Sequence, residues 1–454
     1  MSENAELDSI FQYIDNHTEE IVSDLQELCR QPSISTTHTG IEEMAGLVHS
    51  RLERAGLNAA FHETDGHPIV TGKLEGASLK TLLFYNHYDV QPAEPLEEWT
   101  SPPFEARVVD GHVIARGATD NKGNIISRLA AFEAFLAVRG KLPCSIKYLI
   151  EGEEEIGSPS LENFIINNRE MLEADGCIWE DNTVREHIPV LALGNKGLCY
   201  LELRCRTANV DFHSSNAQMY ENAAWRIAWA LASMKDQDEN VLVEGFYDGI
   251  EPLTEKEEEL VNKIPPYDGK TRRENFELRR FALDMPDEEL ARRHLVHPSF
   301  NIAGFDAGYT GEGVKTIVSG RARAKIDCRL VVGQTPEKIH DCIRRHLDKN
   351  GFEDIETELL FSSLPAKSDP ESDVVKACAE SSRRLYGEEP IINPFGNGST
   401  PTWIVIKHLD LPLSSTGVGC ITSRTHSANE NVKIEHLIMG AKYMAGICES
   451  FGTK

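Results

Sequence analysis

The chain has 454 residues, of which 40% are hydrophobic, so it is long enough for two sizeable cores and its composition argues against wholesale disorder. Its 73 acidic and 46 basic side chains give a formal net charge of −27, and a surface this acidic repels phosphate backbones, so we expect no nucleic-acid partner. No apolar run approaches the roughly 18–20 residues of a membrane helix, and the acidic N-terminus lacks a signal-peptide pattern. We therefore expect a cytoplasmic protein without a membrane partner, whose ten scattered cysteines are mostly buried thiols.

The first 180 residues alternate between amphipathic patterns and short apolar runs. A helix pattern near the N-terminus stops at Pro32, and Ser158-Pro159 suits a helix start, with the serine as cap. The predicted elements are helices within 5–30, 41–55 and 124–138, and strands over 81–86, 145–150 and 176–180. Because the strands are almost continuously apolar, we expect an α/β sheet covered by helices on both faces.

The pattern changes near residue 197. The segments 198–206 and 321–332 alternate in polarity, as half-exposed strands do, and 251–297 is typical of an exposed helical insertion. Further helices are predicted over 221–234 and 336–349, with a strand over 355–363. This mixture predicts an α+β domain whose sheet has one open face.

After Pro365 the α/β pattern returns, with a helix over 371–386, the glycine-rich GNGSTP at 396–401, another helix and a loop that holds His426. The simplest architecture is a mixed sheet flanked by helices, interrupted by an inserted α+β domain. The expected boundaries are 1–196 and 366–454 for the two parts of the first domain and 197–365 for the insertion.

Three predicted strands of the first domain run into residues that bind metals. The strand TLLFYN leads to His87 and Asp89, SIKYLI leads to the EGEEE run at 151–155, and GCIWE leads to Asp181. In open α/β sheets the ligand crevice lies beyond the carboxyl ends of the strands. Asp120 lies in the glycine-flanked loop ARGATDNKG just before a helix, which could bring it to the same edge.

Each of these features also has an ordinary explanation. His87 and Asp89 point the same way on an extended segment, which suits an imidazole ligand held by a carboxylate, but His87 alone is equally well an ordinary strand-end histidine. Consecutive glutamates are most often a solvated acidic turn. The alternative is that one glutamate binds a metal while its neighbour acts as general base to a water between two metals.

Four segments in this order resemble the M20 metallopeptidases: HYDVQP (87–92), ARGATDNKGN (115–124), EGEEEIGS (151–158) and RTHSANE (424–430). The likeness is nearest to the branch of cytosolic non-specific dipeptidases and carnosinases. It extends into the inserted domain through PSFNIAGFDAGYTGEGVKT (298–316). Any one motif alone is weak evidence for the family, whereas the four motifs in this order are specific to it.

The resemblance implies a centre of two divalent metal ions, in this family zinc, with Mn²⁺ or Co²⁺ as alternatives. Glu154 would be the general acid and base, and Asp89 would orient His87. The resemblance also implies a cis peptide bond between Asp120, the bridging ligand, and Asn121. The implied ligands are His87 and Asp181 for one metal, Asp120 as the bridge, and Glu155 and His426 for the other.

For the inserted domain the resemblance implies a lid that also forms a homodimer. His213 would reach the active site of the other subunit and stabilise the oxyanion, and Arg329 would bind the C-terminal carboxylate of the substrate. Thr316, Gly398 and Ser399 match positions that contact substrate. From the pattern alone, His213 is equally a surface residue and Arg329 a strand-surface charge.

Two motifs depart from the branch in ways that affect the expected substrate. Glu153 stands where the branch has a bulky apolar residue and Ile156 where it has a small polar one, and GNGSTP replaces its GGSIP. The expected function is hydrolysis of the amide bond of a small peptide-like substrate, either a dipeptide or the C-terminus of a short peptide. The alternative is an N-acyl-amino-acid deacylase of the acetylornithine or succinyl-diaminopimelate type, and a remote one is a non-catalytic binding protein on the same scaffold.

Overall fold

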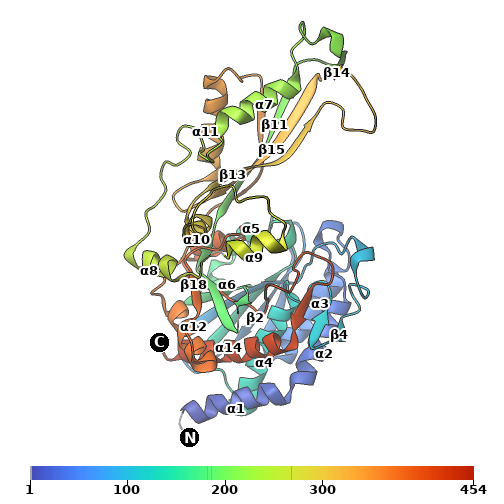
Figure 1. Ribbon diagram of the computed structural model, residues 1–454. Coiled ribbons are helices and arrows are strands. Elements are labelled where there is room, and N and C mark those ends of the chain that lie inside the picture. Colours follow the sequence, from blue (N-terminus) through green and yellow to red (C-terminus); the bar gives the residue numbers. More distant parts are fainter. Residues whose placement is uncertain (1–2, 181, 186, 267) are drawn as a thin grey trace. The chain divides into compact units, whose positions relative to one another are not determined.

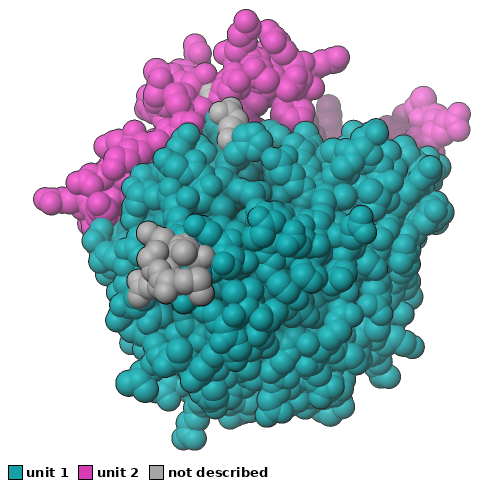
Figure 2. Space-filling view, turned by 90° about the horizontal axis from the view of Figure 1, so that it is seen from below, with its two compact units in different colours: residues 1–194, 367–394, 400–454 teal, residues 195–366, 395–399 magenta. Residues whose placement is uncertain are grey.

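The computed structural model describes residues 3–180, 182–185, 187–266 and 268–454. The chain divides into two compact units, coloured teal and magenta in Figure 2. Unit 1 consists of Met1–Gly194, Lys367–Pro394 and Thr400–Lys454, and unit 2 of Asn195–Ala366 and Phe395–Ser399. Within the described ranges, no helix has the length and apolarity needed to cross a membrane.

Within its described residues, unit 1 contains a nine-stranded mixed sheet (Figure 1). In spatial order its strands are β1 (Asn58–His62), β2 (Ile69–Leu74), β6 (Ser145–Glu151), β3 (Thr81–His87), β7 (Gly176–Trp179), β19 (Leu413–Ser415), β9 (Ile188–Ala192) and β18 (Ile391–Asn393), with β8 (Val184–Arg185) beside β9. The central strands β6, β3, β7 and β19 run parallel, so their carboxyl ends meet at one edge of the sheet.

Both faces of this sheet are covered by helices, as the apolar strands predict. Alternate side chains of β3 point to opposite faces, so Leu82 and Phe84 belong to one hydrophobic core while Leu83 and Tyr85 belong to another. The first core is completed by α1 (Glu3–Asn16), α2 (Thr18–Arg30), α3 (Ile41–Arg54), α4 (Lys122–Arg139), α12 (Asp373–Tyr386) and α14 (Ile434–Gly452). The second is completed by α5 (Leu161–Asn167), α6 (Arg169–Leu172) and α13 (Thr402–Leu409).

A small three-stranded sheet joins two distant segments of unit 1. Its strands are β20 (Asn431–Lys433), β5 (His112–Ile114) and β4 (Arg107–Val109). Pairing of β20 with β5 places the segment after His426 beside the segment before Asp120. Two motifs that are more than 300 residues apart in the chain are therefore held next to each other.

Unit 2 is an α+β unit with a four-stranded antiparallel sheet, β13 (Ser299–Ala307), β15 (Arg321–Leu330), β11 (Gly197–Arg206) and β16 (Glu356–Ser363). The helices α7 (Ala223–Met234) and α11 (Pro336–Lys349) pack against this sheet and share a core with it (Figure 1). Along β15, Ala322 and Ala324 are buried while Arg321 and Arg323 are exposed, as the alternating sequence predicts.

The remaining elements are short. In unit 2 they are β12 (Phe212–His213), β14 (Ile317–Val318), η4 (Ser214–Asn216), α8 (Glu255–Lys263), α9 (Gly269–Asn275) and α10 (Asp287–Val296), and the last three confirm the predicted helical insertion. In unit 1 they are η1 (Ser35–Thr37), η2 (Leu96–Glu98) and η3 (Glu154–Ile156). The strands β10 (Gly194–Asn195) and β17 (Ala366–Lys367) pair with each other. All ten cysteines are free, and nine of them are buried.

Two local predictions were wrong. The pattern over 5–30 forms two helices, because the chain turns at His17, whose imidazole bonds to the Tyr13 carbonyl. Ser158 does not cap a helix, since its hydroxyl donates to Glu151 at 2.8 Å and α5 begins only after Ser160.

Candidate metal centre

The centre lies at the carboxyl ends of the parallel strands of unit 1. His87 is the last residue of β3, and Glu151, directly opposite in the register, is the last residue of β6. Side chains located just after these strands therefore start from the same edge, as expected for an open α/β sheet.

His87 is buried and has a carboxylate at each ring nitrogen. Its Nε2 lies 3.0 Å from Asp120 Oδ1, and its Nδ1 lies 3.3 Å from Asp89 Oδ1 and 3.1 Å from the Asp89 carbonyl oxygen. The ring orientation is fixed from the Asp89 side, which leaves Nε2 directed toward Asp120. His87 is thus not an isolated strand-end histidine.

The Asp120 loop is held by a buried carboxylate from the segment RTHSANE (424–430). Glu430, with 0% exposure, accepts the backbone N–H groups of Gly117, Thr119 and Asp120 at 3.0–3.1 Å and the Arg116 guanidinium at 2.7 Å. The Asp120–Asn121 peptide bond is cis, as the resemblance predicts.

His426 lies on the other side of Asp120. Its Nε2 is 3.0 Å from Asp120 Oδ2 and 3.1 Å from Glu155 Oε2. Arg424, His426 and Asn429 all have positive φ angles, of 55°, 61° and 61°, a conformation that non-glycine residues adopt only when their surroundings enforce it. Asp120 therefore presents one carboxylate oxygen to each of two imidazoles.

The glutamate run is not a solvated acidic turn. Glu151 is 1% exposed and accepts the hydroxyls of Tyr85 and Ser158. Glu153 is 4% exposed and accepts the backbone N–H groups of His67 and Ser160. Both carboxylates are therefore hydrogen-bonded within the fold and are not exposed to solvent.

The next two glutamates face the centre. Glu154 and Glu155 begin η3, and the Asp89 carboxylate accepts their backbone N–H groups at 3.2 and 3.0 Å. The Gln91 amide donates to Glu155 Oε2 at 2.9 Å. Asp89 thus orients His87 and fixes the η3 turn at the same time.

The surrounding carboxylates raise the pKa values of the two imidazoles. Burial acts to lower the pKa of His87, but hydrogen bonds with Asp120 and Asp89 outweigh it and raise that pKa well above its usual value. Hydrogen bonds with Asp120 and Glu155 raise the pKa of His426 to about 10. The centre attracts positive charge at the positions of both rings.

The same surroundings favour the neutral form of Glu154. Burial, together with the smaller effect of the nearby Glu180 carboxylate, raises the pKa of Glu154 well above its usual value, while the His87 ring acts to lower it. A carboxylate whose proton affinity is raised in this way is suited to accept a proton near neutral pH.

The predicted ligand Asp181 lies outside the described residues, whereas its neighbour Glu180 lies at the centre. Glu180 Oε2 is 3.6 Å from His87 Nε2, and Glu180 Oε1 accepts the Trp179 indole N–H at 3.0 Å. The sequence does not single out Glu180, because the pattern GCIWE predicts it as the last residue of the strand. Since β7 ends at Trp179, Glu180 is the first residue beyond the sheet edge.

The predicted substrate residues belong to unit 2. His213 is exposed and accepts the Ser215 N–H, and the Thr316 carbonyl accepts the neighbouring Ser214 N–H. Arg329 donates to the Ser399 hydroxyl at 2.8 Å. The exposed Gly398 directly precedes Ser399.

Arg329 has a second cation beside it. The Ser399 hydroxyl donates to the Lys196 carbonyl at 2.7 Å, and the Lys196 ammonium, 5% exposed, donates to two backbone carbonyls, those of His294 and His297. Burial, with a smaller contribution from the charge of Arg329, lowers the pKa of Lys196 to about 8. Two adjacent cations give this part of unit 2 a positive potential that suits an anionic group.

The donor atoms of the unit 1 centre fit divalent metals. Ligand atoms of His87, Asp120 and Glu155 all lie within 4.8 Å of one another. Imidazole nitrogen and carboxylate oxygen are donors that Zn²⁺ accepts, and Mn²⁺ or Co²⁺ take the same set. The carboxylates of Asp89, Asp120 and Glu155 lie against the two imidazoles, so the fold supplies more negative than positive charge at this point.

Residues 83–450 match the sequence profile of peptidase family M20/M25/M40. The chain belongs to this family. It is an M20 metallopeptidase, as the sequence predicts, and the family hydrolyses peptide bonds in a metal-dependent reaction.

Known M20 relatives span nearly the whole chain. A solved M20 family metallo-carboxypeptidase from Sulfolobus solfataricus is 37% identical, with a TM-score of 0.90, over 96% of this chain and 100% of that one. Beta-Ala-His dipeptidase from Rattus norvegicus is 28% identical over 97% of this chain and 94% of its own length. A Cys-Gly metallodipeptidase from Schizosaccharomyces pombe is 28% identical over 96% of each chain. The match to the solved structure confirms the predicted α/β fold class.

Proposed function

We propose that this M20 enzyme cleaves dipeptides, or removes the C-terminal residue of short peptides, at a centre of two divalent metal ions. The supporting observation is the position of Asp120, with one carboxylate oxygen 3.0 Å from each of two imidazoles, those of His87 and His426. A carboxylate between two such sites suits a bridging ligand.

The proposed ligand set divides around that bridge. His87 would hold one metal, together with Asp181 or Glu180, and Glu155 and His426 would hold the other. When bound, the metal pair would supply Lewis acidity that polarises the scissile carbonyl and lowers the pKa of a water. We propose zinc as the metal, with manganese or cobalt as functional substitutes.

Glu154 performs the proton transfers in this proposal. It takes the proton of the attacking water and passes it to the amine that leaves when the C–N bond breaks. Its raised pKa supports this role, because a strongly acidic carboxylate would hold the proton too weakly to carry it. Asp89 keeps His87 and the η3 turn in place during these steps.

In unit 2 we propose that Arg329 binds the C-terminal carboxylate of the substrate, with Thr316, Gly398 and Ser399 as further contacts. In line with the resemblance, His213 would donate a hydrogen bond to the oxyanion in the other subunit of a homodimer. A monomeric enzyme in solution would contradict that part. We also propose a cytoplasmic location.

The substrate class is tested by assaying the metal-loaded enzyme against two sets of compounds. We expect amine release from Cys-Gly, Ala-Ala and short peptides with a free C-terminus, and no turnover of acetylornithine or succinyl-diaminopimelate. The reverse pattern would identify a deacylase on the same metal site. If the enzyme turned over none of these compounds, the proposed substrate class would be wrong.

Replacing Arg329 with methionine should reduce kcat/KM by ~30- to 150-fold, because a hydrogen-bonded charge pair contributes about 2–3 kcal/mol to substrate binding. The measurement compares Ala-Ala with its C-terminal amide in both enzymes. Wild type should lose a similar factor on the amide, whereas Arg329→Met should treat both substrates alike.

Arg323→Met is the matched control for this experiment. Arg323 lies on the same strand, is exposed, and pairs with Asp306 at 3.0 Å. It should leave kcat/KM for Ala-Ala unchanged. If Arg329→Met still prefers the free carboxylate as strongly as wild type, Arg329 does not bind that group.

A further inference from the structure

A buried arginine in the middle of α4 contacts the ends of the strands that lead to the metal centre. Arg128 is 1% exposed, and its guanidinium donates to the carbonyl oxygens of Tyr85 at 2.6 Å, Trp179 at 2.8 Å and Glu180 at 2.5 Å. A longer contact of 3.5 Å reaches the carbonyl oxygen of Thr416. These carbonyls belong to β3, to the end of β7 and to the residue after β19.

Two of these strand ends, those of β3 and β7, adjoin a residue of the centre. Tyr85 lies two residues before His87, and Glu180 itself lies 3.6 Å from His87. One planar group with several fixed donors can hold separate backbone segments in a single arrangement, which a lysine ammonium cannot reproduce. Arg128 is therefore placed to set the spacing between the strands that supply the ligands.

The network continues to the loop of the proposed bridging ligand. Arg128 also donates to the Asn86 side-chain oxygen, which accepts the Tyr148 hydroxyl at 2.6 Å as well. The Asn86 amide nitrogen donates to the side-chain oxygen of Asn121, the residue after Asp120. Arg128 is thus connected to both sides of the His87–Asp120 pair.

Charge adds a second effect. Burial lowers the pKa of Arg128, and the nearby Glu180 carboxylate is among the groups that oppose this. A guanidinium stays protonated in proteins, so Arg128 places a fixed positive charge behind a centre rich in carboxylates. This charge reduces the mutual repulsion of those carboxylates before any metal binds.

We propose that Arg128 is a positioning residue that pre-organises the metal centre by holding the carboxyl ends of β3 and β7 and, through Asn86, the Asp120 loop. The inference rests on the metal centre proposed above. Residues that orient ligands from behind influence metal affinity as well as stability, whereas a purely structural arginine influences stability alone.

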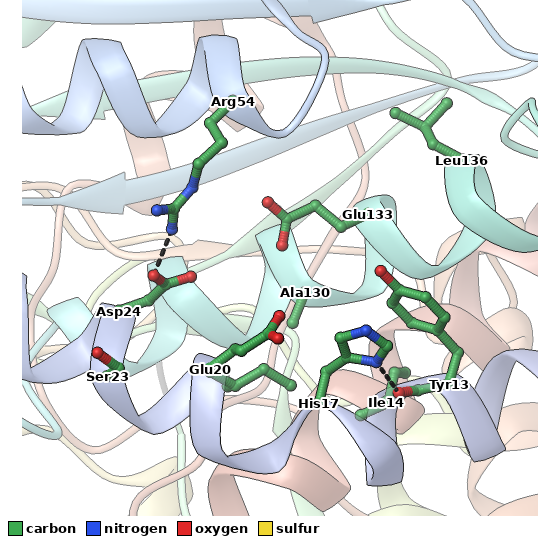
Figure 3. A pocket seen from close by; sticks show the side chains of 11 residues that line it. Tyr13, Ile14, His17, Glu20, Ser23, Asp24, Arg54, Ala130, Glu133 and Leu136 are labelled. Atoms are coloured by element: carbon green, nitrogen blue, oxygen red, sulfur yellow. Dashed lines mark hydrogen bonds and ion pairs between the residues drawn. The ribbon is translucent and has the colours of Figure 1, made fainter.

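Arg51 provides a matched control, because it is also a buried arginine of unit 1. It is 5% exposed and pairs with Asp24 at 2.9 Å and Glu133 at 2.5 Å. Both carboxylates line a cavity of about 540 Å³ among the helices α1 to α4, where Asp24 also pairs with Arg54 (Figure 3). These ion pairs of Arg51 involve none of the residues of the metal centre.

The test measures the dissociation constant of Zn²⁺ by competition with a chelator, alongside the thermal unfolding of the metal-free proteins. Arg128→Lys keeps the charge but loses the fork of donors, and we expect it to weaken Zn²⁺ binding by about 10- to 100-fold. Arg51→Met should lower the unfolding temperature while leaving the dissociation constant at the wild-type value. Arg128→Met, if it folds, should weaken binding more than Arg128→Lys.

Two results would overturn the inference, and they are distinguishable. If Arg128→Lys binds Zn²⁺ as tightly as wild type and differs only in unfolding temperature, Arg128 is structural and the metal centre stands. If wild type itself binds no divalent metal, the proposed centre fails, and the role of Arg128 fails with it.

Discussion

Replacing Glu154 with glutamine is expected to lower kcat on Ala-Ala by about 10³-fold, because a general base contributes roughly 10²- to 10⁴-fold and an amide cannot accept the proton of the attacking water. The substitution preserves shape and leaves Glu155 in place, so the metal content should stay at the wild-type value. Steady-state kinetics together with elemental analysis of the purified variant measure both quantities.

The neighbouring glutamate supplies the control. Glu155 Oε2 lies 3.1 Å from His426 and accepts the Gln91 amide, so Glu155→Gln should lose metal as well as activity. The two adjacent substitutions thus have different signatures, one catalytic and one of binding. Full activity in Glu154→Gln would remove it from the mechanism.

The second large effect is expected on removing the metals. Exhaustive chelation should abolish peptide hydrolysis, and Zn²⁺, Mn²⁺ or Co²⁺ should restore it as the content rises to two metal ions per chain. The metal-free enzyme should also unfold at a lower temperature, because its clustered carboxylates repel one another. A free metal concentration of about 100 times the dissociation constant raises the free energy of unfolding by about 2.7 kcal/mol.

Activity and unfolding temperature measured along the same titration test this prediction. Readdition of Mg²⁺ is a useful comparison, since Mg²⁺ retains its water shell and prefers oxygen ligands over imidazole. Activity that survives in metal-free protein would contradict the account, whatever the stability of that protein.

The parts of the site that could be predicted are those set by strand direction. Parallel strands bring the residues at their carboxyl ends to one edge of the sheet, so His87 and the glutamate run could be placed together from the sequence. The contact of Asp120 with His426 could not be derived in this way. It depends on pairing of β20 with β5 and on the buried Glu430 carboxylate, both of which join segments distant in the chain.

The exact end of each element and the burial of individual charges could not be predicted from the sequence. One residue at the end of β7 decides whether Glu180 counts as strand or as part of the centre. The glutamate run does not reveal that Glu151 and Glu153 are engaged by hydroxyl and backbone donors. Arg128 lies in a helix that is buried along most of its length. Hydrophobic periodicity therefore does not distinguish Arg128 from its neighbours.

The proposed binuclear centre is tested most directly by anomalous diffraction from crystals grown with Zn²⁺. We predict two peaks roughly 3.5–4 Å apart, with the Asp120 carboxylate between them. His87 should coordinate the metal at one peak, and Glu155 and His426 should coordinate the metal at the other. The same map would show whether Asp181 or Glu180 is the second ligand of the metal at His87. A single peak, or peaks that do not share Asp120, would contradict the account.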